Sequence, residues 1–377
     1  MNNDKKFINE LWKKAENTLY ALYGDMPDIR ILNRFYSEKM TFGGSDAIIL
    51  WDRVGKIRCE ALKRNHFIRT SGNAGSCFTA YLLGAAENNP LPLHYRCEKC
   101  GRTEFADKSY ALPFDACEKE CHCTGIMRPD GFDIPYEMNL VNLRSPRISL
   151  VVSSGFLSEA ERMTSEYPSI SVVPYSAFDK AEELSEKTGV DFHEVCVGIS
   201  EKISSDERIT RELTKGNTAG IANFDLQIEG FASVNDALNL AKPETTHEIL
   251  KLVSALHGTG TWINNAERLV KEGVGIKDIP TSRDDLFMLL RDSLQSAGYS
   301  DNGIAFELTE RIRHGRLDAS SRLILSSLDL PEWFMDYVES IKYMFPKAHS
   351  VSYLREALAF MWFKLNYPEK FDAVAKN

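Results

Sequence analysis

The sequence lacks the features that mark membrane and secreted proteins. No run of about eighteen apolar residues occurs, which excludes an ordinary transmembrane helix. The N-terminal residues MNNDKKF lack the apolar stretch of a secretory signal peptide. We therefore predict a cytoplasmic protein and expect no membrane partner. Internal repeats, low-complexity tracts and flexible linkers are also missing, so we expect ordinary globular domains.

A strong excess of basic charge is missing as well. The formal net charge is −9, which argues against a free-standing DNA-binding protein. The acidic residues lie mainly in the middle, however, because residues 1–70 hold 13 Lys and Arg against 9 Asp and Glu, and residues 311–377 hold 10 against 8. This distribution permits nucleic-acid binding at either end. With 377 residues, 43% of them apolar, the chain is long enough for two or three domains.

What the sequence does contain is a dense cluster of cysteines. Five of its eight cysteines fall between residues 97 and 123, which in a cytoplasmic chain favours a metal site over disulfides. Cys97 and Cys100 form a C-x-x-C knuckle, and the later cysteines supply the second half of a predicted zinc ribbon with structural zinc. We expect Cys97, Cys100 and Cys117 as ligands, with Cys121 and Cys123 as alternatives for the fourth place. A site that has lost its metal is the other interpretation.

Hydrophobic periodicity predicts a helical N-terminal segment, a small α/β segment and then helices. Gly24 is a suitable end for the first helix, Asp28 can cap the second, and Ser45 or Asp46 can cap the third. The other expected elements are strands at 66–70, 148–152 and 170–173, helices at 77–86 and between the last two strands, and helices from Ser176 onward.

A glycine-containing turn, residues 70–76, lies between the first expected strand and the helix at 77–86. It matches neither the P-loop nor the dinucleotide fingerprint, so an ordinary strand-to-helix turn is the simpler interpretation. The backbone N–H groups of such a turn can also approach a phosphate.

A resemblance to a known family runs through most of residues 8–371. The segment IKYMFPKAHSVSYLREALAFMWFKLNYPEKF (341–371) resembles the fingers of the bacterial DNA polymerase III α subunit of the PolC type, a C-family replicative polymerase. SALHGTGTWINNAERLV (254–270) resembles another fingers motif. AENTLYALYGDMPDI and HFIRTSGNAGSCFTA resemble the start of the palm, and NPLPLHYRCEKCG through DGFDIPYE resembles the zinc-binding insertion.

The resemblance implies that the palm has lost its catalytic carboxylates. Where the family has Pro-Asp-Ile-Asp-Leu, this chain has PRISL, with Arg147 and Ser149 at the aspartate positions, and the third aspartate aligns with Ser171. In the family these aspartates hold magnesium, and an arginine with two serines cannot replace such ligands. We therefore expect no catalytic residues and no magnesium, although Arg147 could bind phosphate itself. The family's thumb is expected to be largely missing.

The resemblance also implies residues that contact phosphate, nucleotide or DNA. The glycine turn keeps Gly72, Gly75 and Ser76 of the family's phosphate-binding turn but has Ser71 in place of its arginine. A basic turn at a helix end also complements the helix dipole, so a purely structural role is the alternative for the fingers arginines. The expected contacts in the fingers are His257, Arg313, Arg316, Lys347 and His349.

Together these observations predict an α+β, mostly helical fold. It would contain a reduced nucleotidyltransferase-like palm with a zinc-ribbon insertion and a large helical fingers domain. The expected domains are the N-terminal part of the palm at 1–90, the zinc-binding insertion at 91–137, the reduced palm at 138–192 and the fingers at 193–377. Counting from the family's flanking motifs makes Cys117 the third zinc ligand and Cys123 the fourth.

For function we expect a truncated, catalytically inactive PolC-like protein that acts by binding. Its ligand would be DNA, a nucleotide or a replisome component, and its role that of an accessory factor, competitor or decoy. One alternative is a polymerase fragment with residual nucleotidyltransferase activity. The other is a structural subunit that uses the fingers as a protein interface.

Overall fold

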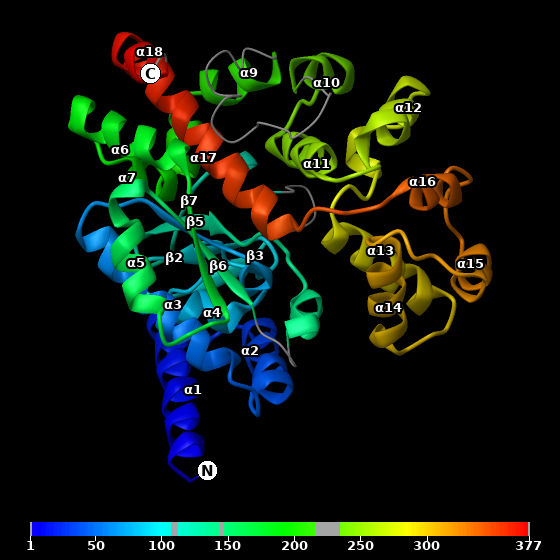
Figure 1. Cartoon of the computed structure of the whole chain (residues 1–377), viewed down its shortest axis with the longest axis horizontal. Coiled ribbons are helices and arrows are strands. Elements are labelled where there is room, and N and C mark those ends of the chain that lie inside the picture. The colour runs from blue at the N-terminus through cyan, green and yellow to red at the C-terminus, as the bar shows by residue number, and fades with distance from the viewer. Residues whose placement is uncertain (1, 107–111, 143–146, 216–233, 376–377) are drawn as a thin grey trace. The chain divides into compact units, whose positions relative to one another are not determined.

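The computed structural model describes residues 2–106, 112–142, 147–215 and 234–375 (Figure 1). The chain packs into two compact units: unit 1 contains residues 1–209 and 358–377, and unit 2 contains residues 210–357. The expected α+β, mostly helical fold is confirmed. The expected domain boundaries at residues 90, 137 and 192 remain predictions.

Unit 1 combines helices with two small sheets. α1 ends before Gly24, which adopts the left-handed φ of +74° that favours glycine at a helix end. Asp28 accepts a hydrogen bond from the backbone N–H of Arg30 and so caps α2 as predicted. Helices of this unit are α1 (Asn2–Tyr23), α2 (Ile29–Phe42), α3 (Ala47–Lys63), α4 (Phe78–Leu82), α5 (Leu157–Thr164), α6 (Ser176–Thr188), α7 (Phe192–Val197), α8 (Ile199–Ser205) and α18 (Pro368–Ala375).

The first sheet has three strands in the order β1-β6-β7. β1 (Ile68–Ser71) runs antiparallel to β6 (Ile148–Val152), which runs parallel to β7 (Ile170–Pro174). Both expected strands at 148–152 and 170–173 are present. One face of β6, with Ile148, Leu150 and Val152, is buried in the main hydrophobic core together with residues of α1–α5. The opposite face carries Ser149 and is more exposed.

The helix expected at 77–86 is shorter in the structure, where α4 ends at Leu82. Gly84 follows with a φ of +74°, which turns the chain out of the helix. This turn packs directly on α3, because a Cβ at Gly55 would lie only 2.1 Å from the carbonyl oxygen of Leu83. The close approach of the two backbones therefore limits α4, an effect that hydrophobic periodicity does not reveal.

The second sheet lies in the predicted zinc-ribbon segment. Its four antiparallel strands follow the order β3-β2-β5-β4. A small core of its own lies around Tyr95 and Met127 and includes two buried cysteines. The strands are β2 (His94–Cys97), β3 (Thr103–Phe105), β4 (Lys119–Glu120) and β5 (Ile126–Asp130).

The described residues of unit 2 form helices and connecting loops, with an isolated antiparallel β-bridge between Thr259 and Tyr343. Polar side chains cap the N-termini of several of its helices. Thr245 and Glu248 form a reciprocal capping box at α11, and Ser282 caps α13. Its helices are α10 (Val234–Ala241), α11 (Thr246–His257), α12 (Glu267–Lys271), α13 (Arg283–Ser296), α14 (Asn302–Ile312), α15 (Ala319–Ser326) and α16 (Phe334–Ser340). α9 (Arg208–Thr214) and α17 (Lys347–Asn366) each include residues of both units.

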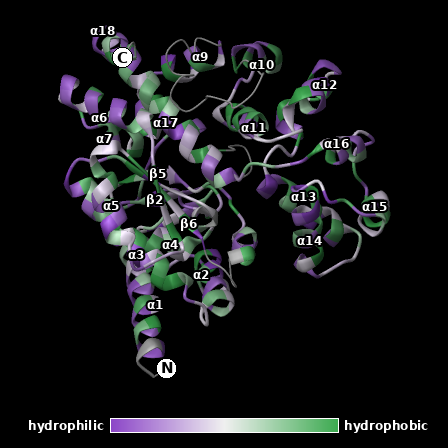
Figure 2. Cartoon of the chain, viewed as in Figure 1, coloured by the Kyte–Doolittle hydropathy of each residue, from purple (hydrophilic) through white to green (hydrophobic). Residues whose placement is uncertain are grey.

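The distribution of hydropathy follows this packing. In Figure 2 α4 is largely hydrophobic, whereas α1 alternates hydrophobic and hydrophilic residues along its length. The main core contains residues of α1–α5 and of the first sheet. Among the described residues, no helix combines the length and the apolar character that crossing a membrane requires.

A buried carboxylate joins α2 to α4. Glu38 is fully buried, and its two carboxylate oxygens accept hydrogen bonds from the backbone N–H groups of Phe78 and Thr79, each at 2.8 Å. Arg34 donates to the same carboxylate at 2.7 Å and to the carbonyl oxygen of Ser76 at 2.7 Å. Glu38 thus satisfies the first N–H groups of α4, which would otherwise be buried without partners.

A second polar cluster lies inside unit 2, at the beginning of α17. The carboxylate of Asp285 lies 3.0 Å from the ammonium nitrogen of Lys251 and 3.5 Å from that of Lys347. Burial alone would raise the pKa of Asp285, but the two lysines outweigh it and hold this pKa well below its usual range. Asp284 accepts a hydrogen bond from the backbone N–H of Lys347 at 2.8 Å. Burial, reinforced by Lys251, lowers the pKa of the neighbouring His247 to about 4.

We predict that Glu38→Ala lowers the free energy of unfolding of the chain by about 3 kcal/mol, because it leaves two buried N–H groups and the Nε–H of Arg34 without their acceptor. Urea denaturation followed by circular dichroism measures this loss. Glu60→Gln, which removes an exposed partner of Arg64, is the control and should cost no more than about 0.5 kcal/mol. Equal effects of the two substitutions would contradict the capping role.

We predict that unit 2 loses stability as the pH falls from about 6.5 towards 4. The folded pKa of His247, about 4, is below the unfolded value of about 6.5, so in this window the unfolded chain binds more protons than the folded one. The contribution is fully present above pH 6.5 and amounts to about 3 kcal/mol, at about 1.4 kcal/mol for each pKa unit. Thermal unfolding of the parent chain and of His247→Gln across pH 4–8 tests this. A slope that does not change in the variant would contradict the prediction.

Candidate nucleotide-binding face and metal centre

Three serines form a row across the first sheet. Ser71 of β1 pairs with Ser149 of β6, and Ser149 pairs with Ser171 of β7. Cross-strand partners point to the same face of a sheet, so their hydroxyls share one side. The hydroxyl oxygens of Ser149 and Ser171 lie 2.7 Å apart in a hydrogen bond. The two positions that the sequence aligned with separate family aspartates are therefore neighbours.

Arg147 lies directly before β6 and is exposed. Alternation along an extended chain places it on the same face as Ser149, two residues later. Gly72, at the end of β1, packs against this point with a φ of +106°, and a Cβ there would lie 3.2 Å from the carbonyl oxygen of Arg147. The glycine turn and the two positions aligned with aspartates at the start of β6 thus meet at one end of the first sheet.

The rest of the glycine turn is less open than the sequence suggested. Residues Asn73–Ser76 form a short 3-10 helix, Gly75 is half-buried, and Ser76 is fully buried. The N–H groups at the start of α4 are already bonded to Glu38. This end of α4 therefore presents no unoccupied N–H pair of the kind that binds phosphate at helix N-termini.

Four cysteines converge in the second sheet. The sulfur atoms of Cys97, Cys100, Cys121 and Cys123 all lie within 4.8 Å of one another. Cys97 and Cys123 are 3.5 Å apart and Cys100 and Cys121 are 3.8 Å apart, close to the sulfur–sulfur separation of about 3.8 Å in a tetrahedral zinc–thiolate site. This group can bind a metal ion.

The structure brings together four of the five cysteines that the sequence offered as ligands. Cys117 was expected among the first three ligands but is exposed and lies outside the sulfur cluster, whereas Cys121 and Cys123 both belong to it. The reason is the register of β4 and β5, which pairs Lys119 with Met127 and closes the hairpin just after β4. The Cys121 N–H donates to the carbonyl of Gly125 at 2.8 Å, so the second knuckle forms at 121–125.

The local geometry favours a thiolate at Cys97. Burial opposes ionisation of Cys97, but hydrogen bonds from the backbone N–H groups of Cys100 and Lys99 outweigh it and lower its pKa to about 6. Backbone hydrogen bonds favour ionisation of Cys121 and Cys123, but burial and sulfur–sulfur hydrogen bonds to neighbouring cysteines outweigh them and raise these two pKa values. Gly125 lets the chain pass close to the sulfurs, since a Cβ there would lie 2.9 Å from the sulfur of Cys97.

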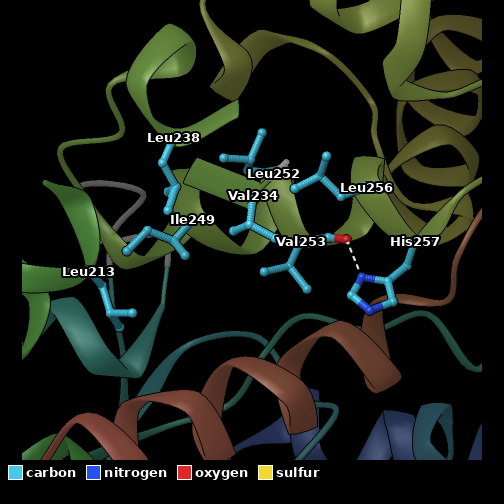
Figure 3. A pocket seen from close by; sticks show the side chains of 8 residues that line it. All are labelled: Leu213, Val234, Leu238, Ile249, Leu252, Val253, Leu256 and His257. Atoms are coloured by element: carbon cyan, nitrogen blue, oxygen red, sulfur yellow. Dashed lines mark hydrogen bonds between the residues drawn. The ribbon is translucent and has the colours of Figure 1, made fainter. Parts of the chain in front are cut away.

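In unit 2, His257 lies at the edge of an apolar pocket under α10 and α11 (Figure 3). Its Nδ1 donates to the carbonyl oxygen of Val253 at 2.9 Å, and its ring stacks on Phe345 with centroids 4.9 Å apart. The remaining lining residues are aliphatic: Leu213, Val234, Leu238, Ile249, Leu252, Val253 and Leu256. These surroundings resemble a hydrophobic core more than a phosphate-binding loop.

The other basic residues expected in the fingers are mostly paired within unit 2. Lys347 is buried beside Asp285, and Arg313 forms a salt bridge with Glu310 at 2.5 Å. His349 is half-buried, with its ring 5.4 Å from that of Phe345. Arg316 is exposed. Of these basic residues, Arg316 is thus the most accessible to a ligand. Contacts of His257, Arg313, Arg316, Lys347 and His349 with phosphate, nucleotide or DNA remain predictions.

Sequence reasoning missed the acidic partners. Glu38 and Asp285 lie on helices far along the chain from Phe78 and Lys347, so no spacing rule links them. One signal was available for Asp285, because it follows Ser282 at the capping distance of three residues. Gly125 also carried a signal, as a glycine just after two cysteines.

Comparison with known proteins supports the resemblance noted in the sequence. No protein-family model matches the chain. A DNA polymerase III PolC-type protein of Caldanaerobacter subterraneus subsp. tengcongensis is 25% identical over 97% of this chain and 33% of its own length. The PolC-type protein of Lacticaseibacillus paracasei is 26% identical over the same shares, and that of Streptococcus thermophilus is 26% identical over 93% and 31%.

These alignments extend over 466 to 489 positions, more than the 377 residues of the chain, so the relatives carry internal segments that this chain lacks. The chain is a homologue of the DNA polymerase III PolC-type proteins and spans about one third of their length.

Proposed function

We propose that this chain is a PolC-like protein that works by binding and not by nucleotidyl transfer. Its ligand is DNA, a nucleotide or a replisome protein, and it acts as an accessory factor, competitor or decoy. The observation that carries the proposal is the hydrogen bond between Ser149 and Ser171, with Arg147 on the same face. Two-metal catalysis needs carboxylate oxygens at such positions to hold Mg²⁺ against the substrate phosphates. Two hydroxyls and a guanidinium do not supply that donor set.

A second observation favours a different role for unit 2. Lys347 and Arg313 are paired with Asp285 and Glu310 inside the unit, which reduces the positive charge they offer to a nucleic acid. The alternative is therefore a structural subunit whose fingers form a protein interface. In that case substitution of exposed Arg316 leaves DNA affinity unchanged.

The binding role predicts measurable affinity for a fluorescent primer–template in low salt, about 50 mM, falling steeply as salt rises. Arg316→Gln should weaken binding about threefold, as expected for the loss of one phosphate contact. Arg322→Gln is the matched control, because Arg322 is exposed but paired with Glu339 at 2.7 Å, and it should have no effect. Fluorescence anisotropy measures both variants.

Two outcomes would overturn this role. The first is the absence of any binding to DNA or nucleotide, together with no replisome protein retained on the immobilised chain. The second is template-dependent primer extension with Mg²⁺ or Mn²⁺, which would show that polymerase chemistry persists.

We also propose that the cysteine cluster holds one structural zinc ion, with Cys97, Cys100, Cys121 and Cys123 as a closed set of four thiolates. Such a site stabilises the fold and leaves no open position for catalysis.

For this site we predict about one zinc ion per chain in protein purified without chelator, measured by elemental analysis. Cys100→Ser should lose the metal and unfold the second sheet, because structural zinc contributes directly to folding. Cys117→Ser is the matched control and should keep the metal, since Cys117 lies outside the sulfur cluster. Metal-free parent protein of normal stability, or loss of zinc in Cys117→Ser, would contradict the assignment.

A further inference from the structure

The exposed face of the palm-like sheet carries a positive charge beside two hydroxyls. Arg147 is exposed, and among the described residues no carboxylate forms a salt bridge with it. Ser149, two residues further along the chain, and its cross-strand partner Ser171 are placed on the same face by strand alternation, with their hydroxyl oxygens 2.7 Å apart. A paired set of hydroxyls uses one O–H for the bond between them, so the second O–H remains able to donate elsewhere.

This combination suits an oxyanion. A guanidinium presents several N–H groups in a planar fork that matches two oxygens of a phosphate, and a serine hydroxyl adds a third donor. Gly72 packs closely against the backbone of Arg147, because a Cβ there would lie 3.2 Å from the Arg147 carbonyl oxygen. This contact holds the glycine turn against the start of β6, which Arg147 directly precedes and which contains Ser149.

We propose that Arg147, Ser149 and Ser171 form an anion site that binds a phosphate group directly, without a divalent metal ion. The guanidinium supplies the positive charge that a metal ion would otherwise provide, and the hydroxyl pair donates a hydrogen bond to another phosphate oxygen. This inference rests on the proposed binding function and names the chemistry of its ligand. The phosphate comes from a nucleoside triphosphate or from a nucleic-acid backbone, and both share this chemistry.

The site has a property that separates it from a metal-dependent one. Mg²⁺ neutralises phosphate oxygens, and the guanidinium repels the ion at short range. Binding is therefore strongest in EDTA and weakens when Mg²⁺ is added. A site that uses metal ions behaves in the opposite way.

Isothermal titration of the full chain with sodium pyrophosphate, in EDTA and then in excess Mg²⁺, tests the proposal. Arg147→Gln should weaken pyrophosphate binding about tenfold, as expected for the loss of a charge-assisted contact. The double variant Ser149→Ala with Ser171→Ala should weaken it about threefold. Arg162→Gln is the matched control, because Arg162 is exposed in the same unit but paired with Glu159, and it should bind as the parent does. All these positions are accessible, so the variants are expected to fold.

The outcomes distinguish this proposal from the broader one. Absence of pyrophosphate binding, binding that requires Mg²⁺, or equal affinity in Arg147→Gln overturns the anion site, even if the chain still binds primer–template. Pyrophosphate binding that depends on Arg147, in a chain that binds no DNA, nucleotide or replisome protein, supports the anion site and overturns the broader function. Repeating the titration with a nucleoside triphosphate and with a thymidine oligonucleotide identifies the source of the phosphate, by showing which of the two loses affinity in Arg147→Gln.

Discussion

The parallel pairing of β6 with β7 is the constraint on which the candidate face depends. Parallel neighbours need a crossover of a dozen or more residues, and here the segment that contains α5 supplies it. The resulting register sets Ser149 opposite Ser171. A shift by one residue would turn the Ser171 hydroxyl away from this face, because side chains alternate along a strand. Two residues from separate segments meet only because this short connection fixes their alignment.

The two units differ in which of their polar side chains are accessible to solvent. Unit 1 leaves the hydroxyls of Ser149 and Ser171, Arg147 and part of its cysteine cluster accessible, while the carboxylate of Glu38 is fully buried and hydrogen-bonded. Unit 2 instead buries charges in opposed pairs at the beginning of α17. Buried pairs of this kind contribute to a defined arrangement of helices more than to ligand affinity. Arg147 and the hydroxyls of Ser149 and Ser171 lie in unit 1, and the contacts predicted for the fingers residues of unit 2 remain predictions.

Much of the fold was predictable because its signals are local. Asp28 and Gly24 mark helix ends through their own backbone geometry, and the alternation of Ile148, Leu150 and Val152 marks a half-buried strand. The candidate sites depend on longer-range effects. The choice among the later cysteines follows from the register of β4 and β5, and the occupied start of α4 follows from a carboxylate forty residues earlier. Neither the register nor such a partner is encoded in the spacing of neighbouring residues.

The end of α1 and the first metal-binding knuckle touch backbone to backbone. Gly101 has a φ of +72°, and a Cβ there would lie 2.4 Å from the backbone nitrogen of Gly24. No side chain separates the two segments, so a movement of one displaces the other directly. The four cysteines can bind a metal ion, and an ion held there would restrain a helix that supplies none of its ligands. Hydrogen exchange of the amides in the last turn of α1 should then be slower when the four cysteines hold a metal ion than when they do not.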